Sequence, residues 1–411
     1  MLKLKTLYHS GRGATNAVSS IIKRMATRRF IYLDHAATTP VHPDVLEAML
    51  PYFSEEFGNP GGLYSLSQRA KDAVETARRT IARVLGCAPT EVIFTSGGSE
   101  SDNLAIRGVA MGARAAHRGN HIITSAVEHH AVENTCHQLR DHYGFEVSEV
   151  GVDAYGQVAP EDVQKAIRSE TVLISIMYAN NEVGTIQRVA QIGTIAREHG
   201  IAFHTDAVQA AAYLPVDVNS LNVDLLSLGA HKFYGPKGVG ALYVRQGTRL
   251  LPVQTGGGHE NNRRAGTENV PYIVGMAKAL ERAHANRAQN VARLNPLRKR
   301  LIDGVSGTIA GASLTGHPSE RLPHNASFVI EAVEAGPVLL ALDLAGIAAS
   351  SGSACTSAAM EPSHVLNAMG VPRALAQGAL RMTLGPENTL DEIDVVLETL
   401  PEIVSRLRRM N

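Results

Sequence analysis

The sequence has no excess of either charge, since its 411 residues include 39 Lys and Arg against 39 Asp and Glu. Proteins that bind nucleic acid or an anionic membrane surface usually carry a basic excess, so neither kind of partner is indicated. The chain also lacks any apolar run approaching the ~20 residues of a membrane span. Its 44% apolar and 19% charged residues are typical of an ordinary globular enzyme.

Cysteine is scarce, with only Cys87, Cys136 and Cys355 in the whole sequence. These three form neither a C-x-x-C motif nor the spacing of a disulfide framework. Such usage favours a reducing compartment, and we expect a cytoplasmic protein. Cys87 follows a helix end and Cys136 lies within a helical stretch, so both are expected to be packing residues.

The first 33 residues lack acidic side chains but hold seven Lys and Arg. A basic, acid-poor leader is typical of an organellar transit peptide, which would place the protein in an organellar matrix. The alternative, which we favour, is an upstream start codon, with Met25 as the start of a more compact chain. In either case residues 1–29 are expected to be a disordered or non-native leader.

Helix-like and strand-like segments alternate from residue 70 to about 245. A helical face over residues 74–85 ends at Gly86. Short apolar runs follow at residues 92–94, 121–124, 172–177, 201–203, 225–228 and 241–244. This alternation predicts an α/β fold with a mostly parallel sheet covered by helices on both faces.

A chain of 411 residues is too long for a single hydrophobic core. Beyond about residue 285 the regular alternation of strand-like and helix-like segments ends. A charged helical stretch over 287–301 leads to strands at 326–330 and 380–384 and to a final helix over 390–409. We therefore expect a large domain over 46–285 and a smaller α+β domain over 286–411. Residues 30–45 are expected to join the smaller domain.

Two polar side chains follow buried strands within the large domain. Asp206 ends one apolar run, and His231-Lys232 follows the next. Lys232 lies 26 residues after Asp206. Ligands of open α/β sheets bind outside the carboxyl ends of the strands. A lysine and an aspartate there suit pyridoxal 5'-phosphate (PLP), with the amine forming a Schiff base and the carboxylate holding the pyridinium proton. For such a pair taken alone, a buried ion pair is the more common explanation.

A turn of small residues over 95–100 lies between a strand and a helix. Free N–H groups and the helix dipole make such a turn an anion site, and Gly98 lets a phosphate approach closely. Ser99 has a hydroxyl to donate. The signal is weak alone, because such turns are common helix caps, but with Lys232 downstream it is the natural seat of a cofactor phosphate.

Three further positions have two interpretations each. His129 follows a strand, where it serves either as a helix cap or as a ring that stacks on the cofactor and moves protons. Asn181 follows another strand, where it is either an ordinary turn residue or the donor of an amide hydrogen bond to the cofactor's phenolic oxygen. Arg381 precedes a strand-like run and makes either a surface ion pair or a bidentate clamp for a substrate carboxylate.

Cys355 lies in a run of small polar residues, Ser350-Ser351-Gly352-Ser353-Ala354-Cys355-Thr356-Ser357. This run is unsuited to a packed strand or a stable helix, so we expect a mobile loop over about residues 348–362. A cysteine on such a loop is well placed to be a nucleophile.

Together these residues resemble the NifS/IscS-type cysteine desulfurases, which are class V, fold-type I PLP-dependent enzymes. The resemblance extends from residue 31 to about 408 in both order and spacing of motifs. The motifs are Tyr32-Leu33-Asp34-His35-Ala36-Ala37-Thr38-Thr39-Pro40, Gly58-Asn59-Pro60, the turn over 95–100, Glu128-His129, Asn180-Asn181-Glu182-Val183-Gly184, Asp206-x-x-Gln209, His231-Lys232-x-Tyr234-Gly235-Pro236-Lys237-Gly238, Arg264-x-Gly266-Thr267 and the loop of Cys355.

The resemblance implies the fold-type I transferase fold and conversion of L-cysteine to L-alanine, with the sulfur carried on Cys355 as a persulfide. It assigns roles to the candidate residues. Lys232 would hold PLP and move protons, Asp206 would bind the pyridinium, and His129 would stack on the ring and act as acid and base. Gln209 and Asn181 would contact the phenolic oxygen, and Gly98, Ser99 and His231 would bind the phosphate. Arg381 would bind the substrate carboxylate, and Asn181 would also contact the substrate. Thr267 would reach the phosphate of the other subunit, which implies a homodimer. A sulfur-acceptor protein is the implied partner, for iron–sulfur cluster assembly or thio-modification.

Several features depart from the family pattern. Gly229 stands where a phosphate-binding serine is usual, Tyr64 where a histidine is usual, and Pro386 where an arginine is common. The chain ends at Asn411 soon after its last helix, which leaves delivery of sulfur to a scaffold protein open. No firm metal site is predicted, although Cys355 has the chemistry to ligate an iron–sulfur cluster transiently. The alternatives are a selenocysteine lyase, another class V aminotransferase or lyase, or a catalytically silent binding protein.

Overall fold

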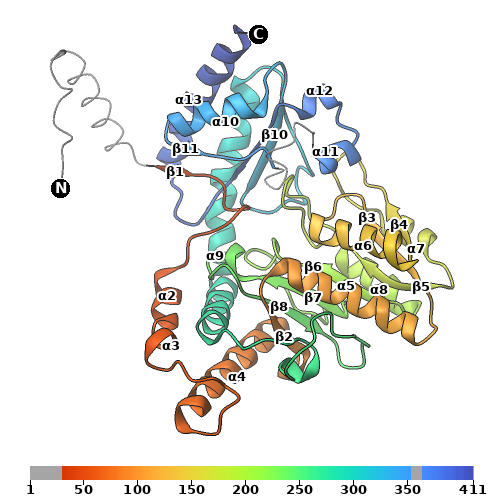
Figure 1. The fold of residues 1–411 in the computed structure, drawn as a ribbon. Helices are drawn as coiled ribbons and strands as arrows, with labels where there is room; N and C mark the ends of the chain where they lie inside the picture. Colours follow the sequence, from red (N-terminus) through yellow and green to blue (C-terminus); the bar gives the residue numbers. More distant parts are fainter. Residues whose placement is uncertain (1–29, 353–362, 411) are drawn as a thin grey trace, which may run out of the picture.

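A seven-stranded sheet forms the centre of the structure, a computed structural model that describes residues 30–352 and 363–410 (Figure 1). The strand order is β2-β8-β7-β6-β5-β3-β4. The strands are β2 (Val92–Thr95), β3 (His121–Ser125), β4 (Glu146–Val150), β5 (Thr171–Ser175), β6 (Ala202–Asp206), β7 (Leu225–Gly229) and β8 (Gly240–Val244). Only β8 runs antiparallel to its neighbours β2 and β7, so the predicted mostly parallel sheet is confirmed.

Helices connect and cover these strands. They are α4 (Ser65–Leu85), α5 (Gly98–Ala115), α6 (His130–Tyr143), α7 (Pro160–Ala166) and α8 (Val189–Glu198). Helix α5 packs across β5 to β8, and α8 packs on β6. Strands covered in this way are buried along their whole length, which explains why they read as continuous apolar runs.

Helix α9 (Val270–Thr308) connects this sheet to the C-terminal part of the chain (Figure 1). Its 39 residues run without a break through Pro296. The predicted domain boundary at residues 285 and 286 therefore lies inside a helix, and the division of the chain there stays a prediction.

The C-terminal part holds a three-stranded antiparallel sheet in the order β12-β10-β9. Its elements are β9 (Ala312–Leu314), β10 (Asn325–Ile330), α10 (Ala335–Leu344), β11 (Ile347–Ala348), α11 (His364–Ala368), α12 (Arg373–Ala376), β12 (Ala379–Thr383) and α13 (Leu390–Arg408). Strands β10 and β12 and helix α13 confirm the elements expected at 326–330, 380–384 and 390–409. The capping box of Thr389 and Glu392 begins α13.

The N-terminal segment lies against this C-terminal part. Strand β1 (Ile31–Tyr32) pairs in parallel with β11, and Asp34 forms a bridge with Thr383. Helices α2 (Pro43–Met49) and α3 (Pro51–Ser54) follow and contact α9. Residues 33–40 thus run from the small sheet toward the large one.

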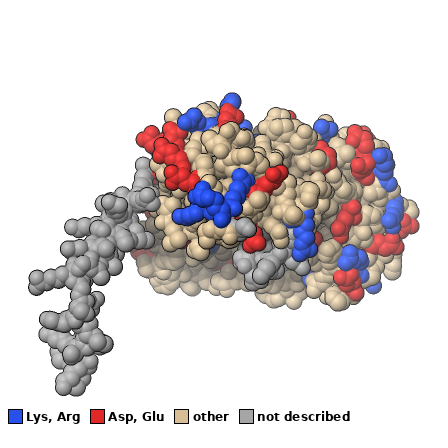
Figure 2. Space-filling model, turned by 90° about the horizontal axis from the view of Figure 1, so that it is seen from above, with Lys and Arg blue, Asp and Glu red and all other residues tan. Residues whose placement is uncertain are grey.

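The surface mixes both charges. Figure 2 shows Lys and Arg side chains interspersed with Asp and Glu over the face that it presents, as the balanced composition predicts. Within the described ranges, no helix combines the length and apolar character needed to cross a membrane.

Candidate active site

A cavity of about 320 Å³ opens where β6 and β7 end. Nine of the predicted site residues line it: Gly98, Ser99, His129, Asn181, Asp206, Gln209, His231, Lys232 and Arg381. They come from six separate segments of the chain, and the fold brings them to one place. The cavity lies at the carboxyl ends of β6 and β7, the position where open α/β sheets bind ligands.

Lys232 ends the short 3₁₀ helix η2 (Ala230–Lys232), directly after β7. Its ammonium group donates hydrogen bonds to the carbonyl oxygens of Ala36 at 2.5 Å and Ala37 at 2.7 Å. Thr39 fixes the same region, because its hydroxyl donates to the carbonyl of His231 at 3.0 Å and accepts from the amide of Tyr234 at 2.8 Å. Residues 36–39 thus form a wall of the lysine site, a role that sequence reasoning did not assign to them.

Asp206 is the last residue of β6 and is 6% exposed. Its Oδ1 accepts the amide of Val208 at 2.8 Å, which fixes the carboxylate at the strand end. Burial raises the pKa of Asp206, while the charges of His129 and Lys232 act to lower it. A buried carboxylate of this kind is suited to bind a cationic group of a ligand.

His129 is a helix cap and also lines the pocket, while its stacking on a cofactor and its transfer of protons stay predictions. It precedes α6, and its Nδ1 accepts the amide of Ala131 at 3.1 Å. In the neutral ring the proton must then lie on Nε2, which leaves a donor for a ligand. Burial, assisted by the charge of Lys232, lowers the pKa of His129, so the ring is neutral at neutral pH.

The predicted anion site lies between β2 and α5. Helix α5 starts at Gly98, and 18 residues contribute to its dipole. A Cβ on Gly229 would approach the amide nitrogen of Gly98 to 3.3 Å, so the glycine keeps this amide uncovered. The acidic residue of the first turn, Glu100, is held by Arg264 at 2.7 Å. That ion pair offsets a charge that would otherwise repel a phosphate.

His231 borders the same anion site from the lysine turn. Its Nδ1 lies 3.2 Å from the hydroxyl of Thr38. Burial lowers the pKa of His231 to about 4, with further contributions from Lys232 and Lys237. The imidazole is therefore neutral at neutral pH and acts as a hydrogen-bond donor rather than as a charge.

Arg381 lies in β12 and is 2% exposed, so the interpretation as a surface ion pair is wrong. One terminal nitrogen donates to Asp34 at 2.8 Å, and the other donates to the carbonyl oxygens of Asn181 at 2.9 Å and Gly352 at 3.2 Å. Among the residues that the structure describes, its buried Nε has no hydrogen-bond partner. The other two nitrogens thus fix the guanidinium at the pocket wall.

Cys355 lies outside the described residues, but the chain on either side of it reaches the pocket. Gly352 and His364 both line the cavity. The hydroxyl of Ser363 donates to Oε2 of Glu182 at 2.5 Å, and a Cβ on Gly352 would lie 3.2 Å from the same oxygen. Residues on both sides of 353–362 therefore lie at the pocket wall.

Sequence reasoning missed several residues that line the cavity, notably Ala36, Ala37, Asp102, Glu182 and His364. Glu182 and the two alanines belong to motifs that were noticed but given no role. Thr267 is exposed and lies outside the cavity, so this single chain does not bring it to the site. Its assignment to the site of a partner subunit stays a prediction.

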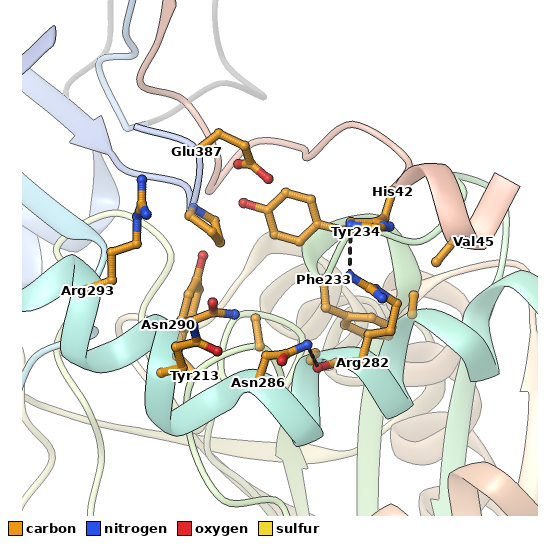
Figure 3. Close-up of a pocket in the computed structure, with 15 residues that line it drawn as sticks. His42, Val45, Tyr213, Phe233, Tyr234, Arg282, Asn286, Asn290, Arg293 and Glu387 are labelled. Carbon is orange, nitrogen blue, oxygen red and sulfur yellow. Dashed lines mark hydrogen bonds between the residues drawn. The ribbon is translucent and has the colours of Figure 1, made fainter. Parts of the chain in front are cut away.

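A second cavity of about 280 Å³ lies between α2, α9 and the segment after β12 (Figure 3). The Glu387 carboxylate points toward Tyr234 there, and Arg282 and Arg293 approach from α9. Burial, with Tyr213 and Glu387 adding to it, raises the pKa of Tyr234. No lysine is among the described residues that line this cavity, so it does not compete with the site of Lys232.

Comparison with known proteins identifies the family of this chain over more than nine-tenths of its length. Residues 31–396 match the family model described as aminotransferase class-V. The chain is 52% identical over 381 residues to the cysteine desulfurase IscS of Methanosarcina thermophila, with 93% of each chain covered. It is 49% identical over 384 residues to the enzyme of the same name from Dictyoglomus turgidum, covering 93% of this chain and 97% of that protein.

Solved structures agree with these sequences. A NifS-like protein superposes with a TM-score of 0.86 at 38% identity, covering 92% of this chain and all of that one. The protein SspA, solved in complex with cysteine, superposes with a TM-score of 0.77 at 38% identity, covering 87% of this chain and all of that one. The fold-type I architecture expected from the motifs is thereby confirmed. The chain belongs to the class-V aminotransferase family and, within it, to the NifS/IscS-type cysteine desulfurases.

Proposed function

We propose that this protein is a PLP-dependent cysteine desulfurase, which converts L-cysteine to L-alanine and receives the sulfur on Cys355. The observation that carries the proposal is a single pocket that joins Lys232, Asp206 and both flanks of the segment bearing Cys355. The named relatives are cysteine desulfurases at about half identity over nearly the whole chain, which supports the same activity.

The residues of the pocket fit PLP. The amine of Lys232 suits its aldehyde, the carboxylate of Asp206 its ring nitrogen, and the uncovered amide of Gly98 its phosphate. Ser99 and His231 add donors at the phosphate, and Gln209 and Asn181 add amides at the ring. A cavity of about 320 Å³ falls in the range for such ligands. When bound, PLP acts as an electron sink for the substrate's α-carbon.

The chain's own groups divide the remaining work. Arg381 lines the pocket and binds the substrate carboxylate through charge-assisted hydrogen bonds of its guanidinium. His129 is kept neutral by its lowered pKa and offers Nε2–H as a proton donor at the ring. Lys232 moves a proton on the substrate from its position beside Asp206. The Cys355 thiolate attacks the substrate sulfur and forms the sulfur–sulfur bond of a persulfide. The carbon–sulfur bond breaks, its electron pair stays with the substrate's β-carbon, and that carbon takes up a proton to become the methyl group of alanine.

In this proposal a separate acceptor protein takes the sulfur from Cys355. The sulfur is then used for iron–sulfur cluster assembly or thio-modification. A homodimer, with Thr267 completing the phosphate site of the partner subunit, belongs to the same proposal. The exposed position of Thr267 supports it, because a residue buried in its own chain has no access to another subunit.

The proposal is tested by comparing the parent protein with Lys232→Ala and a matched control, Lys278→Ala, whose lysine lies on the surface of α9. We expect Lys232→Ala to lose the visible absorption of lysine-bound PLP and at least ~10³-fold in alanine release. The control should keep both. Full alanine release by Lys232→Ala would rule out the proposed mechanism.

A further inference from the structure

Three metal-ligating side chains converge at the edge of the pocket, and none of them has a role in the proposed reaction. His130 and Glu133 lie three residues apart in the first turn of α6, on one face of the helix. His364 is the first residue of α11 and comes from the other part of the chain. One ligand atom from each residue lies within 4.8 Å of the others.

The contacts among them are close to those of a metal site. His130 Nδ1 lies 2.7 Å from Glu133 Oε2, and His364 Nε2 lies 4.0 Å from the same oxygen. The two imidazole rings have centroids 4.6 Å apart. Tetrahedral zinc with bonds of about 2.0–2.2 Å separates its ligand atoms by about 3.3 Å. The distance from His130 Nδ1 to Glu133 Oε2 must therefore lengthen, and the distance from His364 Nε2 to the same oxygen must shorten, each by less than about 1 Å. Side-chain rotation supplies shifts of this size.

The surroundings allow an ion to enter and suit its charge. The three side chains are 31%, 24% and 25% exposed for His130, Glu133 and His364. His364 Nε2 donates a hydrogen bond to the carbonyl oxygen of Glu128 at 2.9 Å. Binding exchanges this single neutral hydrogen bond for a metal–nitrogen bond.

We propose that His130, Glu133 and His364 form a binding site for a divalent ion of the zinc type, which joins α6 to α11 beside the active-site pocket. Two imidazoles and one carboxylate are a common ligand set for zinc and leave a further position for water. His130 and His364 also line the pocket, so the ion lies at its edge. The ion stabilises the contact between two elements that are 220 residues or more apart in the sequence.

Cobalt(II) titration of the tag-free holoenzyme, without free cysteine, tests this site, because cobalt reports its ligands in the visible spectrum. We expect one ion per chain, with bands of nitrogen and oxygen ligands only. His364→Gln and Glu133→Gln should each weaken binding at least ~10-fold, since each removes one of three protein ligands. The matched control is His137→Gln, because His137 lies on the same helix, α6, but pairs with Glu149 of β4 at 2.7 Å.

A second measurement separates this site from adventitious binding by a thiol. Thiolate-to-cobalt charge-transfer bands that vanish in Cys355→Ala would place the ion on that cysteine and overturn the proposal. So would the absence of binding at micromolar cobalt, or equal binding by parent and His364→Gln. Zinc should raise the melting temperature of the parent and of His137→Gln but not that of His364→Gln.

Discussion

The guanidinium of Arg381 donates a hydrogen bond to the carboxylate of Asp34 at 2.8 Å, although the two residues are 347 positions apart. The pair joins the N-terminal segment to β12 at the wall of the pocket. Asp34 and two backbone carbonyls hold the arginine plane in position before any ligand arrives. A substrate carboxylate therefore meets a preorganised donor rather than a flexible side chain.

Replacing Arg381 by lysine should weaken the use of L-cysteine strongly, because lysine keeps the charge but loses the planar set of donors. Hydrogen bonds to charged groups contribute about 1.5–3 kcal/mol, so kcat/KM should fall by roughly 10- to 150-fold. PLP content should stay unchanged. Steady-state kinetics check this, with Arg282→Lys as the control, since Arg282 pairs with Asp44 outside the site. A similar loss in both variants would show that Arg381 has no special role.

Gly352→Ala should slow turnover without loss of PLP. Gly352 has a φ of +98°, which strains any other residue, and a Cβ there would lie 3.2 Å from Oε2 of Glu182. The strain costs about 1–2 kcal/mol and displaces the chain that leads to Cys355. We expect at least a ~5-fold lower kcat from this cost.

Gly370→Ala is the matched control for that change. Gly370 also has a positive φ, +77°, but a Cβ there meets nothing within 4 Å. Its backbone strain is comparable, and it lies outside the pocket. Equal kcat values for Gly352→Ala and Gly370→Ala would contradict a specific role for the position of Gly352.

The buried carboxyl of Glu128 should make thermal stability depend on pH. Burial raises the pKa of Glu128 from 4.5 to about 8, although Ser125 and the amide of Met177 donate hydrogen bonds to it. Between these two pH values the folded chain keeps a proton that the unfolded chain releases. The contribution of protonated Glu128 to the free energy of unfolding is therefore complete below pH 4.5 and is lost as pH rises toward 8. The loss amounts to up to about 1.4 kcal/mol per pH unit.

Glu128→Gln removes this titration while keeping the size of the side chain. Melting temperatures of the holoenzyme between pH 6 and pH 8 should fall less steeply in the variant than in the parent. Parallel curves would mean that Glu128 is ionised throughout this range and that burial does not control its pKa.

The sequence was sufficient to predict the main strands and the pair of Lys232 and Asp206, because both residues directly follow apolar runs that are buried on each side. Strand β4 was missed, since its Glu-Val-Ser-Glu-Val sequence lies at the sheet edge and is mostly accessible. The two-residue strands β1 and β11 are too short for any periodicity.

The contacts that complete the site could not be predicted from local patterns. Ala36 and Ala37 bind Lys232 through backbone carbonyls, which carry no side-chain signal and lie about 195 positions away in the sequence. Glu182 likewise meets Ser363 only through the fold. The role proposed for Thr267 needs a second subunit, so a single chain does not test it.

The most direct test of the central claim is the release of alanine and sulfide from L-cysteine, with PLP and a reductant present, by the parent and by Cys355→Ala. Cys87→Ala is the control, because burial raises the pKa of Cys87 to about 12 and keeps its thiol protonated. We predict that Cys355→Ala loses the activity while it keeps the visible absorption of bound PLP, and that Cys87→Ala keeps both. Alanine release by Cys355→Ala at the parent rate would contradict the account and leave a PLP-dependent lyase of another kind.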